Sequence, residues 1–188
     1  MRAILVAIAT VAIMTNTLAQ SSTQSADPLA RQTTSFELIV HLPLEQTAPL
    51  FGPLGELAWA GGHWNPEFIY PQPAHDQEGA VFSIHHGLYT ATWVCTAFDL
   101  DARHFQYVYF LPGLMVTTID VHFKPVDANG TAVNVIYTRT AIAPEGNAHV
   151  AAMSDGDKNA GAEWQQAIDE HLAKNPRYQS HSSQTIEK

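Results

Sequence analysis

The sequence predicts an α+β fold in which a curved antiparallel sheet wraps around a long C-terminal helix. Three observations support this prediction. Strand-like segments separated by short turns fill residues 80–140, an amphipathic segment long enough for a helix of several turns follows at residues 144–175, and another strand-like segment lies at residues 36–42. Sequential strands with short connections favour antiparallel pairing, and an amphipathic helix needs an apolar sheet face to cover.

Residues 1–19 have the three-part pattern of a secretory signal peptide. Arg2 supplies the positive charge, residues 3–14 are apolar, and small residues precede Gln20. The apolar run is shorter than the ~20 helical residues that span a bilayer. The sequence therefore predicts a cleaved signal peptide and a periplasmic or secreted protein without a stable membrane span. An uncleaved N-terminal anchor is the alternative.

The rest of the chain reads as one domain with polar ends. Residues 20–33, which are rich in Ser, Gln and Thr, and residues 176–188 have too little apolar content to fold. We therefore expect a flexible leader, a single domain at residues 34–175 and a flexible tail. The formal net charge of −9 disfavours nucleic acid as a partner, and the single cysteine excludes an internal disulfide. The oligomeric state stays open.

The domain begins with a predicted strand and two short helical segments. Residues 36–42 combine β-branched and aromatic side chains and end at a proline. Residues 43–51 and 54–59 predict a helical turn or two each, because glycine and proline interrupt them. Residues 63–73 hold three aromatic side chains and three prolines without a period. This segment predicts an ordered loop that is either the wall of a binding site or part of the core.

Five further strands are predicted, at residues 80–86, 90–98, 105–111, 116–123 and 132–140. Residues 127–130 between the last two have a strong hairpin-turn sequence. Apolar and polar side chains alternate along residues 116–123, so one face of this strand should be buried and the other exposed. We expect the buried face to turn towards the closing helix.

Residues 144–175 place apolar side chains at spacings of three and four, as an amphipathic helix requires. Ser154 followed by Asp157 resembles a capping box. We therefore expect a short helix at residues 145–153 and a separate gripping helix at residues 155–174.

Three local motifs add a family resemblance: the aromatic segment Trp64–Pro71, the strand segment Thr92–Thr96, and Pro144–Asn147 leading into the helix. In this order of elements, they resemble the SRPBCC superfamily of START-like, or helix-grip, proteins, in the polyketide cyclase-like and lipid-transfer-like branch. The resemblance implies an apolar cavity between sheet and helix that holds a small ligand. It implies no catalytic residues, because the branch shares no agreed catalytic set.

Tyrosine and tryptophan side chains combine apolar surface with one polar group, which suits the wall of such a cavity. The candidates for ligand binding are Trp59, Trp64, Phe68, Tyr70, Trp93, Tyr107, Tyr109, Tyr137, Arg139, Gly161 and Trp164. Any single aromatic member could instead be ordinary core.

Two members of this set are not aromatic. Arg139 shares a strand face with buried side chains, so its charge must meet a carboxylate, lie at the mouth of the cavity or face water. Gly161 lies in the interior of the predicted helix, where glycine costs about 1 kcal/mol. We expect the close approach of a strand or of a ligand at this position.

Catalytic and metal sites receive less support from the sequence. Cys95 lies within a strand, where an inert buried thiol is expected. Glu67 and Asp76 flank the aromatic segment and could serve as acid or base beside His63 or His75. The histidines show no recognisable ligand spacing, so we expect no metal site and no cofactor.

The function predicted from the sequence is that of an exported protein that binds a small apolar or amphipathic molecule in a cavity between sheet and helix. The first alternative is a cyclase-, isomerase- or hydrolase-like enzyme that uses the same cavity, which requires at least two titratable groups in it. The second is a structural or interaction protein whose cavity is filled by its own side chains.

Overall fold

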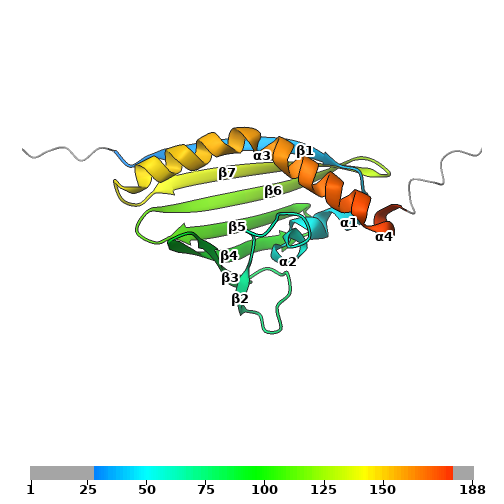
Figure 1. Cartoon of the computed structure of the whole chain (residues 1–188), viewed down its shortest axis with the longest axis horizontal. Helices are drawn as coiled ribbons and strands as arrows, with labels where there is room; N and C mark the ends of the chain where they lie inside the picture. The colour runs from blue at the N-terminus through cyan, green and yellow to red at the C-terminus, as the bar shows by residue number, and fades with distance from the viewer. Residues whose placement is uncertain (1–27, 180–188) are drawn as a thin grey trace, which may run out of the picture.

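The computed structural model describes residues 28–179, which form one seven-stranded antiparallel sheet crossed by a long helix (Figure 1). The strands are β1 (Arg31–Val40), β2 (Glu67–Tyr70), β3 (Val81–His86), β4 (Tyr89–Asp99), β5 (His104–Leu111), β6 (Met115–Asp127) and β7 (Gly130–Ala141). The helical segments are α1 (Leu44–Thr47), the 3-10 helix η1 (Ala48–Phe51), α2 (Pro53–Glu56), α3 (Gly146–Lys174) and α4 (Pro176–Gln179).

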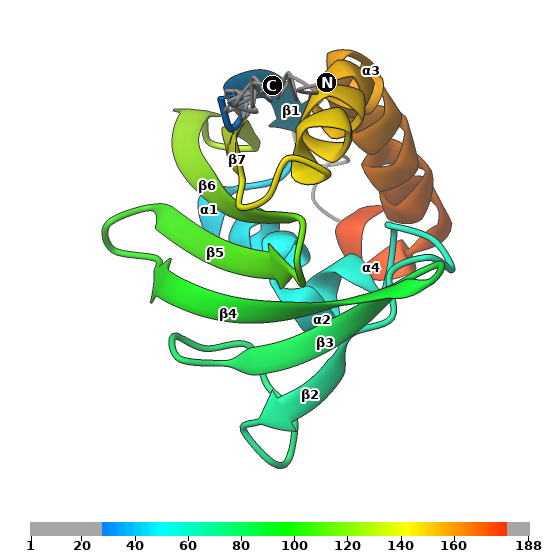
Figure 2. The ribbon, with the colours of Figure 1, turned by 90° about the vertical axis from the view of Figure 1, so that its left-hand side faces the viewer.

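The strand order is β1-β7-β6-β5-β4-β3-β2, so every neighbour except the β1–β7 pair is consecutive in the chain. The sheet curves around the side on which α3 lies, as the view turned by 90° shows (Figure 2). The helices α1, α2 and α4 gather near the C-terminal end of α3 (Figure 1). This arrangement confirms the predicted fold class and the predicted antiparallel strands.

The alternation of side chains decides which residues face the helix. Along β5 and β6, buried residues such as Tyr107 and Ile119 alternate with partly exposed ones such as Gln106 and Asp120. Because opposite residues on paired strands share a face, the buried positions form continuous rows across the sheet. The inner face of the sheet and α3 together enclose the core.

The first strand begins earlier than predicted. β1 starts at Arg31, within the segment expected to be a flexible leader, and Arg31 pairs with Thr140 of β7. The backbone amide of Ala30 also donates to Asn147 Oδ1 at 2.8 Å. Strand pairing satisfies backbone groups whatever the side chains are, so polar composition alone did not reveal this extension. Residues 1–27, which include the predicted signal peptide and most of the predicted leader, lie outside the described residues.

Residues 63–73 were predicted to form an ordered loop. This prediction is wrong for the central part of the segment. Residues Glu67–Tyr70 form the edge strand β2, which pairs with β3. Prolines bound this strand on both sides, and proline is tolerated beside an edge strand because it lacks the amide that an inner strand must donate.

The closing helix is one continuous element, and the predicted division at Ser154 is wrong. Ser154 is only 4% exposed and lies within α3, as does Asp157, which pairs with a residue of the sheet. A Cβ atom built on Gly156 would meet nothing within 4 Å, so this glycine faces open space and costs helix propensity without breaking the helix. Among residues 28–179, no helix is long and apolar enough to cross a lipid bilayer.

The C-terminal segment is also more ordered than predicted up to Gln179. Residues Pro176–Gln179 form α4, and Tyr178 is half-buried against the core with its ring 5.9 Å from that of His171. An aromatic side chain that packs on a neighbouring helix orders the few residues around it. Residues 180–188 of the predicted tail lie outside the described part.

Candidate functional site

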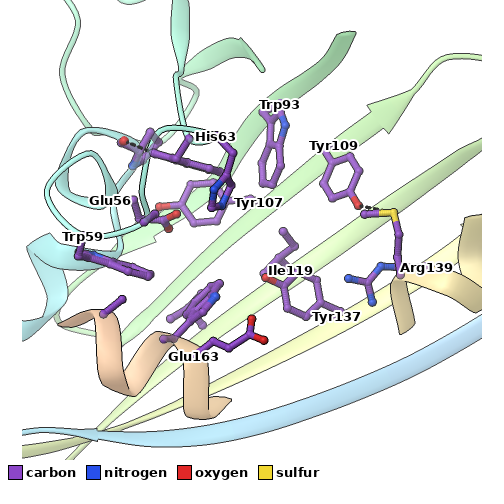
Figure 3. A pocket seen from close by; sticks show the side chains of 17 residues that line it. Glu56, Trp59, His63, Trp93, Tyr107, Tyr109, Ile119, Tyr137, Arg139 and Glu163 are labelled. Atoms are coloured by element: carbon purple, nitrogen blue, oxygen red, sulfur yellow. Dashed lines mark hydrogen bonds between the residues drawn. The ribbon is translucent and has the colours of Figure 1, made fainter. Parts of the chain in front are cut away.

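A cavity of about 380 Å³ lies between the inner face of the sheet and α3 (Figure 3). Strands β4 to β7 form one wall, α3 forms the opposite wall, and α2 with the turn after it closes one end. The lining residues are Pro53, Glu56, Trp59, Ala60, His63, Trp64, Trp93, Tyr107, Tyr109, Ile119, Val121, Tyr137, Arg139, Met153, Glu163, Trp164 and Ala167.

Most residues predicted to form a binding wall do line this cavity. The structure brings together Trp59, Trp64, Trp93, Tyr107, Tyr109, Tyr137, Arg139 and Trp164. Three others lie elsewhere. Phe68 stacks on Phe82 with ring centroids 5.5 Å apart, Tyr70 is exposed, and Gly161 faces β1.

The environment of Gly161 decides between the two reasons proposed for it. A Cβ atom at this position would lie 3.2 Å from the Cβ of Phe36 on β1, which is closer than most real contacts of this kind. β1 therefore approaches this position closely, as one of the two proposed reasons requires. Gly161 is not among the residues that line the cavity.

The aromatic walls are held by ring contacts. Trp93 and Tyr109 stack with centroids 4.4 Å apart, and Trp59 meets Trp164 of α3 edge to face at 5.1 Å. Such pairs add about 0.5–1.5 kcal/mol beyond burial. These contacts link neighbouring lining residues within the sheet and between α3 and the turn after α2.

Several lining residues donate hydrogen bonds to the backbone of η1 and of the first residue of α2. Tyr107 Oη donates to the carbonyl of Phe51 at 3.0 Å, and Trp59 Nε1 donates to the carbonyl of Leu50 at 2.7 Å. Trp64 Nε1 donates to the carbonyl of Pro53 at 2.8 Å. These bonds satisfy carbonyls in a region without regular pairing and fix the closed end of the cavity.

Arg139 forms a buried ion pair at the other end. The Arg139 side chain is 3% exposed, its Nη2 donates to Asp157 Oδ1 at 3.0 Å, and its Nη1 donates to Asp157 Oδ2. Thr34 Oγ1 also donates to this carboxylate. The guanidinium lies 4.4 Å from the ring centroid of Tyr137. Arg139 thus has a carboxylate partner and also lines the cavity.

Hydrogen-bond donors remain available at this end. Arg139 Nε is buried, and no described residue accepts a hydrogen bond from it. The Tyr109 hydroxyl donates to the weak acceptor Met153 Sδ at 3.8 Å, and the side chains of Thr117 and Arg139 also interact with it. Burial raises the pKa of Tyr109, while Thr117 and Arg139 partly offset the rise, so the phenol keeps its proton. Tyr109, whose side chain lines the cavity, is therefore the residue at this end that can donate to an oxygen of a ligand.

Carboxyl groups and an imidazole lie at the end closed by α2. Glu56 and His63 line the cavity there, and Glu163 of α3 lies at an exposed position on its rim (Figure 3). Burial and, secondarily, the charge of Asp76 hold the pKa of Glu56 well above its ordinary value. The sequence analysis missed Glu56 and Glu163, because neither belongs to the alternation of a strand or to a known motif.

The acid–base residues suggested by the sequence are mostly elsewhere. Of that set only His63 lines the cavity, while Glu67 and His75 lie on the surface. Asp76 Oδ1 accepts a hydrogen bond from the backbone amide of Leu54 at 3.0 Å, so it supports the start of α2. Burial raises the pKa of the Cys95 thiol to about 12, which disfavours the reactive thiolate.

Comparison with known proteins identifies the fold. No protein-family model and no curated protein sequence matches the chain. The chain is similar in structure to truncated norcoclaurine synthase from Thalictrum flavum, with a TM-score of 0.58 and 13% identity over 78% of this chain and 96% of that one.

Two further solved structures have the same architecture. Ara h 8.0201 gives a TM-score of 0.56 at 14% identity, over 78% of this chain and 100% of the other. The di-domain ARO/CYC protein BexL from the BE-7585A biosynthetic pathway gives 0.57 at 14% identity, over 77% of this chain and 48% of the other. The chain therefore has the helix-grip fold that its motifs indicated.

Proposed function

From this fold and cavity we infer that the protein binds a small aromatic, amphipathic molecule between its sheet and α3. The observation that carries the inference is a space of about 380 Å³ lined by four tryptophans and three tyrosines among its residues. Small-molecule sites are typically concave, of a few hundred Å³, and mostly apolar with a few placed polar groups. The open volume speaks against the alternative in which the protein's own side chains fill the cavity.

A protein of the same fold supports an aromatic ligand. Norcoclaurine synthase from Thalictrum flavum has been solved in complex with dopamine and hydroxybenzaldehyde, both small aromatic molecules. The identity to this chain is 13%, so the support concerns the kind of molecule that the fold accommodates and not its identity.

The free donors at the Arg139 end specify the polar part of the ligand. The protonated Tyr109 side chain belongs to the cavity lining and the buried Arg139 Nε lacks an acceptor, whereas the carboxylate of Asp157 is already paired. A ligand that displaces water from the cavity should offer an oxygen that accepts a hydrogen bond at this end, because a buried donor left without an acceptor lowers the affinity. We therefore propose a ligand with a carbonyl or ether oxygen on an aromatic ring system.

The test compares two probes that differ by one carbonyl group, 1-tetralone and tetralin. We expect 1-tetralone to bind about ten times more tightly, because a hydrogen bond from these donors contributes roughly 1–1.5 kcal/mol. Quenching of tryptophan fluorescence measures both affinities, since Trp59, Trp64, Trp93 and Trp164 all line the cavity.

The variant Tyr109→Phe should reduce the preference for 1-tetralone while tetralin affinity stays the same. Tyr89→Phe is the matched control, because Tyr89 is exposed and does not line the cavity. If neither probe binds, the proposed binding function is wrong. If both bind equally well, binding stands and the donor end has no role in it.

We also propose that the protein acts outside the cytoplasm. The signal-peptide pattern at residues 1–19 supports this proposal. Sequencing of the mature N-terminus should begin at Gln20, and a mature protein that still begins at Met1 would argue for retention or anchoring.

A second candidate function, proton transfer to or from a bound ketone, is favoured by Glu56. A carboxyl group with a raised pKa inside an apolar cavity is a suitable general acid or base near neutral pH. Cyclases and isomerases of carbonyl compounds begin with removal of a proton next to the carbonyl. A hydrolase with a serine, threonine or cysteine nucleophile is disfavoured, because the described lining contains none of these residues.

This candidate is tested by exchange of the protons at C2 of 1-tetralone in D2O, followed by NMR. The protein should accelerate the exchange, and Glu56→Gln should abolish the acceleration, whereas Glu163→Gln should retain most of it. The carboxylate form is the base and its pKa is raised, so the rate should still rise with pH above the ordinary glutamate range of about 4.3. Exchange no faster than in buffer removes the enzymatic reading and leaves the binding function intact.

A further inference from the structure

The outer face of the sheet carries a cluster of metal-ligand side chains that is separate from the cavity. His104 of β5 and Asp120 and His122 of β6 each place a donor atom within 4.8 Å of the donor atoms of the other two. Their chain neighbours Phe105 and Val121 are buried on the inner face, so the cluster points the opposite way. The sheet therefore separates it from the cavity.

The strand register brings these residues together. His104 and His122 are directly opposite each other on the paired strands β5 and β6, and their rings stack with centroids 4.6 Å apart. Asp120 is two residues before His122 and so shares its face. His104 Nε2 lies 2.9 Å from Asp120 Oδ1.

A hydrogen-bonded chain holds the carboxylate in place. Gln106 Nε2 donates to Asp120 Oδ1 at 2.8 Å, and Thr96 Oγ1 of β4 donates to Gln106 Oε1 at 2.8 Å. Neighbours that orient a ligand in this way are typical of metal sites. Neither bond involves Asp120 Oδ2, and the partly exposed side chains of His104 and Asp120 can adjust without movement of the strands.

We propose that His104, Asp120 and His122 bind one divalent ion of the zinc or copper type. Two imidazole nitrogens and one carboxylate oxygen are donors that such borderline ions accept, and hard ions such as Mg²⁺ prefer oxygen alone. Metal–nitrogen bonds of 2.0–2.1 Å place neighbouring donors about 3.3 Å apart, which small side-chain rotations reach from the present separations. Water completes the coordination, and the ion links β5 to β6.

The sequence analysis expected no metal site, and the reason lies in the spacing. His104 and the Asp120–His122 pair are joined by a β-hairpin, so their separation along the chain matches no compact ligand motif. Only the register of β5 against β6 brings them together.

The experiment titrates the tag-free protein with ZnCl2 at pH 7.5 in an isothermal calorimeter. We expect one equivalent of Zn²⁺ to bind, and the affinity of that site to fall at least tenfold in each of His104→Gln, Asp120→Asn and His122→Gln. His75→Gln is the matched control, because His75 is an exposed histidine outside the cluster. Circular dichroism checks that all four variants fold.

Each outcome decides the proposal. Loss of the site in the three cluster variants together with its retention in His75→Gln supports it. No stoichiometric binding by the unaltered protein, equal affinity in the cluster variants, or an equal loss in His75→Gln overturns it, because the ten histidines would then bind zinc without a defined site. A thermal melt gives a second readout: Zn²⁺ should raise the Tm of the unaltered protein and not that of His122→Gln.

Discussion

Replacement of Asp157 by alanine should lower the free energy of unfolding by about 3–5 kcal/mol, because it leaves the Arg139 guanidinium buried without its carboxylate partner. Arg139 is 3% exposed and Asp157 10% exposed, so water cannot take over the lost interaction without rearrangement. Urea denaturation followed by circular dichroism measures the change.

Two control variants separate this effect from a general weakening of α3. Asp155 lies two residues before Asp157, is exposed and pairs with Lys158. The variant Asp155→Ala should leave the free energy of unfolding almost unchanged, because exposed ion pairs contribute little. The double variant Arg139→Met with Asp157→Leu replaces the pair by apolar groups and should recover most of the loss. A loss below about 1 kcal/mol for Asp157→Ala, the range of an exposed pair, would show that the pair is solvated.

Filling the cavity from both walls should abolish ligand binding while the protein stays folded. Ile119 of β6 and Ala167 of α3 line opposite sides, so Ile119→Trp with Ala167→Phe places new rings in the space of about 380 Å³. We expect the affinity for 1-tetralone to fall at least a hundredfold. Open volume receives the added atoms, so the cost in stability should be at most the roughly 1–3 kcal/mol of overpacking.

The control for this variant adds the same bulk outside the cavity. Thr118 neighbours Ile119 on the opposite face of β6, and Ala162 lies on the exposed side of α3. Thr118→Trp with Ala162→Phe should bind 1-tetralone as the unaltered protein does. Equal binding by the filled variant and this control would mean that the probe binds elsewhere.

The sequence predicted the parts of the fold that depend on side-chain patterns. Alternation along β6, with Ile119 buried beside the partly exposed Asp120, was enough to identify the strand and its inner face. Elements that depend on backbone pairing were missed or misplaced. β2 and the first residues of β1 show no alternation of apolar and polar side chains. They are strands because their backbones pair with β3 and β7.

The residues of the candidate site were also predictable only where a side-chain pattern indicates them. Tyrosines and tryptophans on the inner face follow from alternation, and a carboxylate partner was one of three positions expected for Arg139, beside the cavity mouth and water. The identity of that partner was not accessible, because Asp157 sits in a sequence that resembles a helix start, and a distant strand rather than local sequence determines its role. Glu56 and His63 come from a short helix and the turn after it, where no period indicates which side chains face inwards.

The central claim is that the cavity itself binds a small aromatic molecule, and nuclear Overhauser contacts test this most directly. Protein with labelled methyl groups is saturated with 1-tetralone, and contacts are recorded between ligand protons and protein methyls. We predict contacts to Ile119, Val121 and Ala167, which line the cavity. Contacts only to exposed methyls such as those of Leu88 and Ile69, or no contacts at saturation, would contradict the claim.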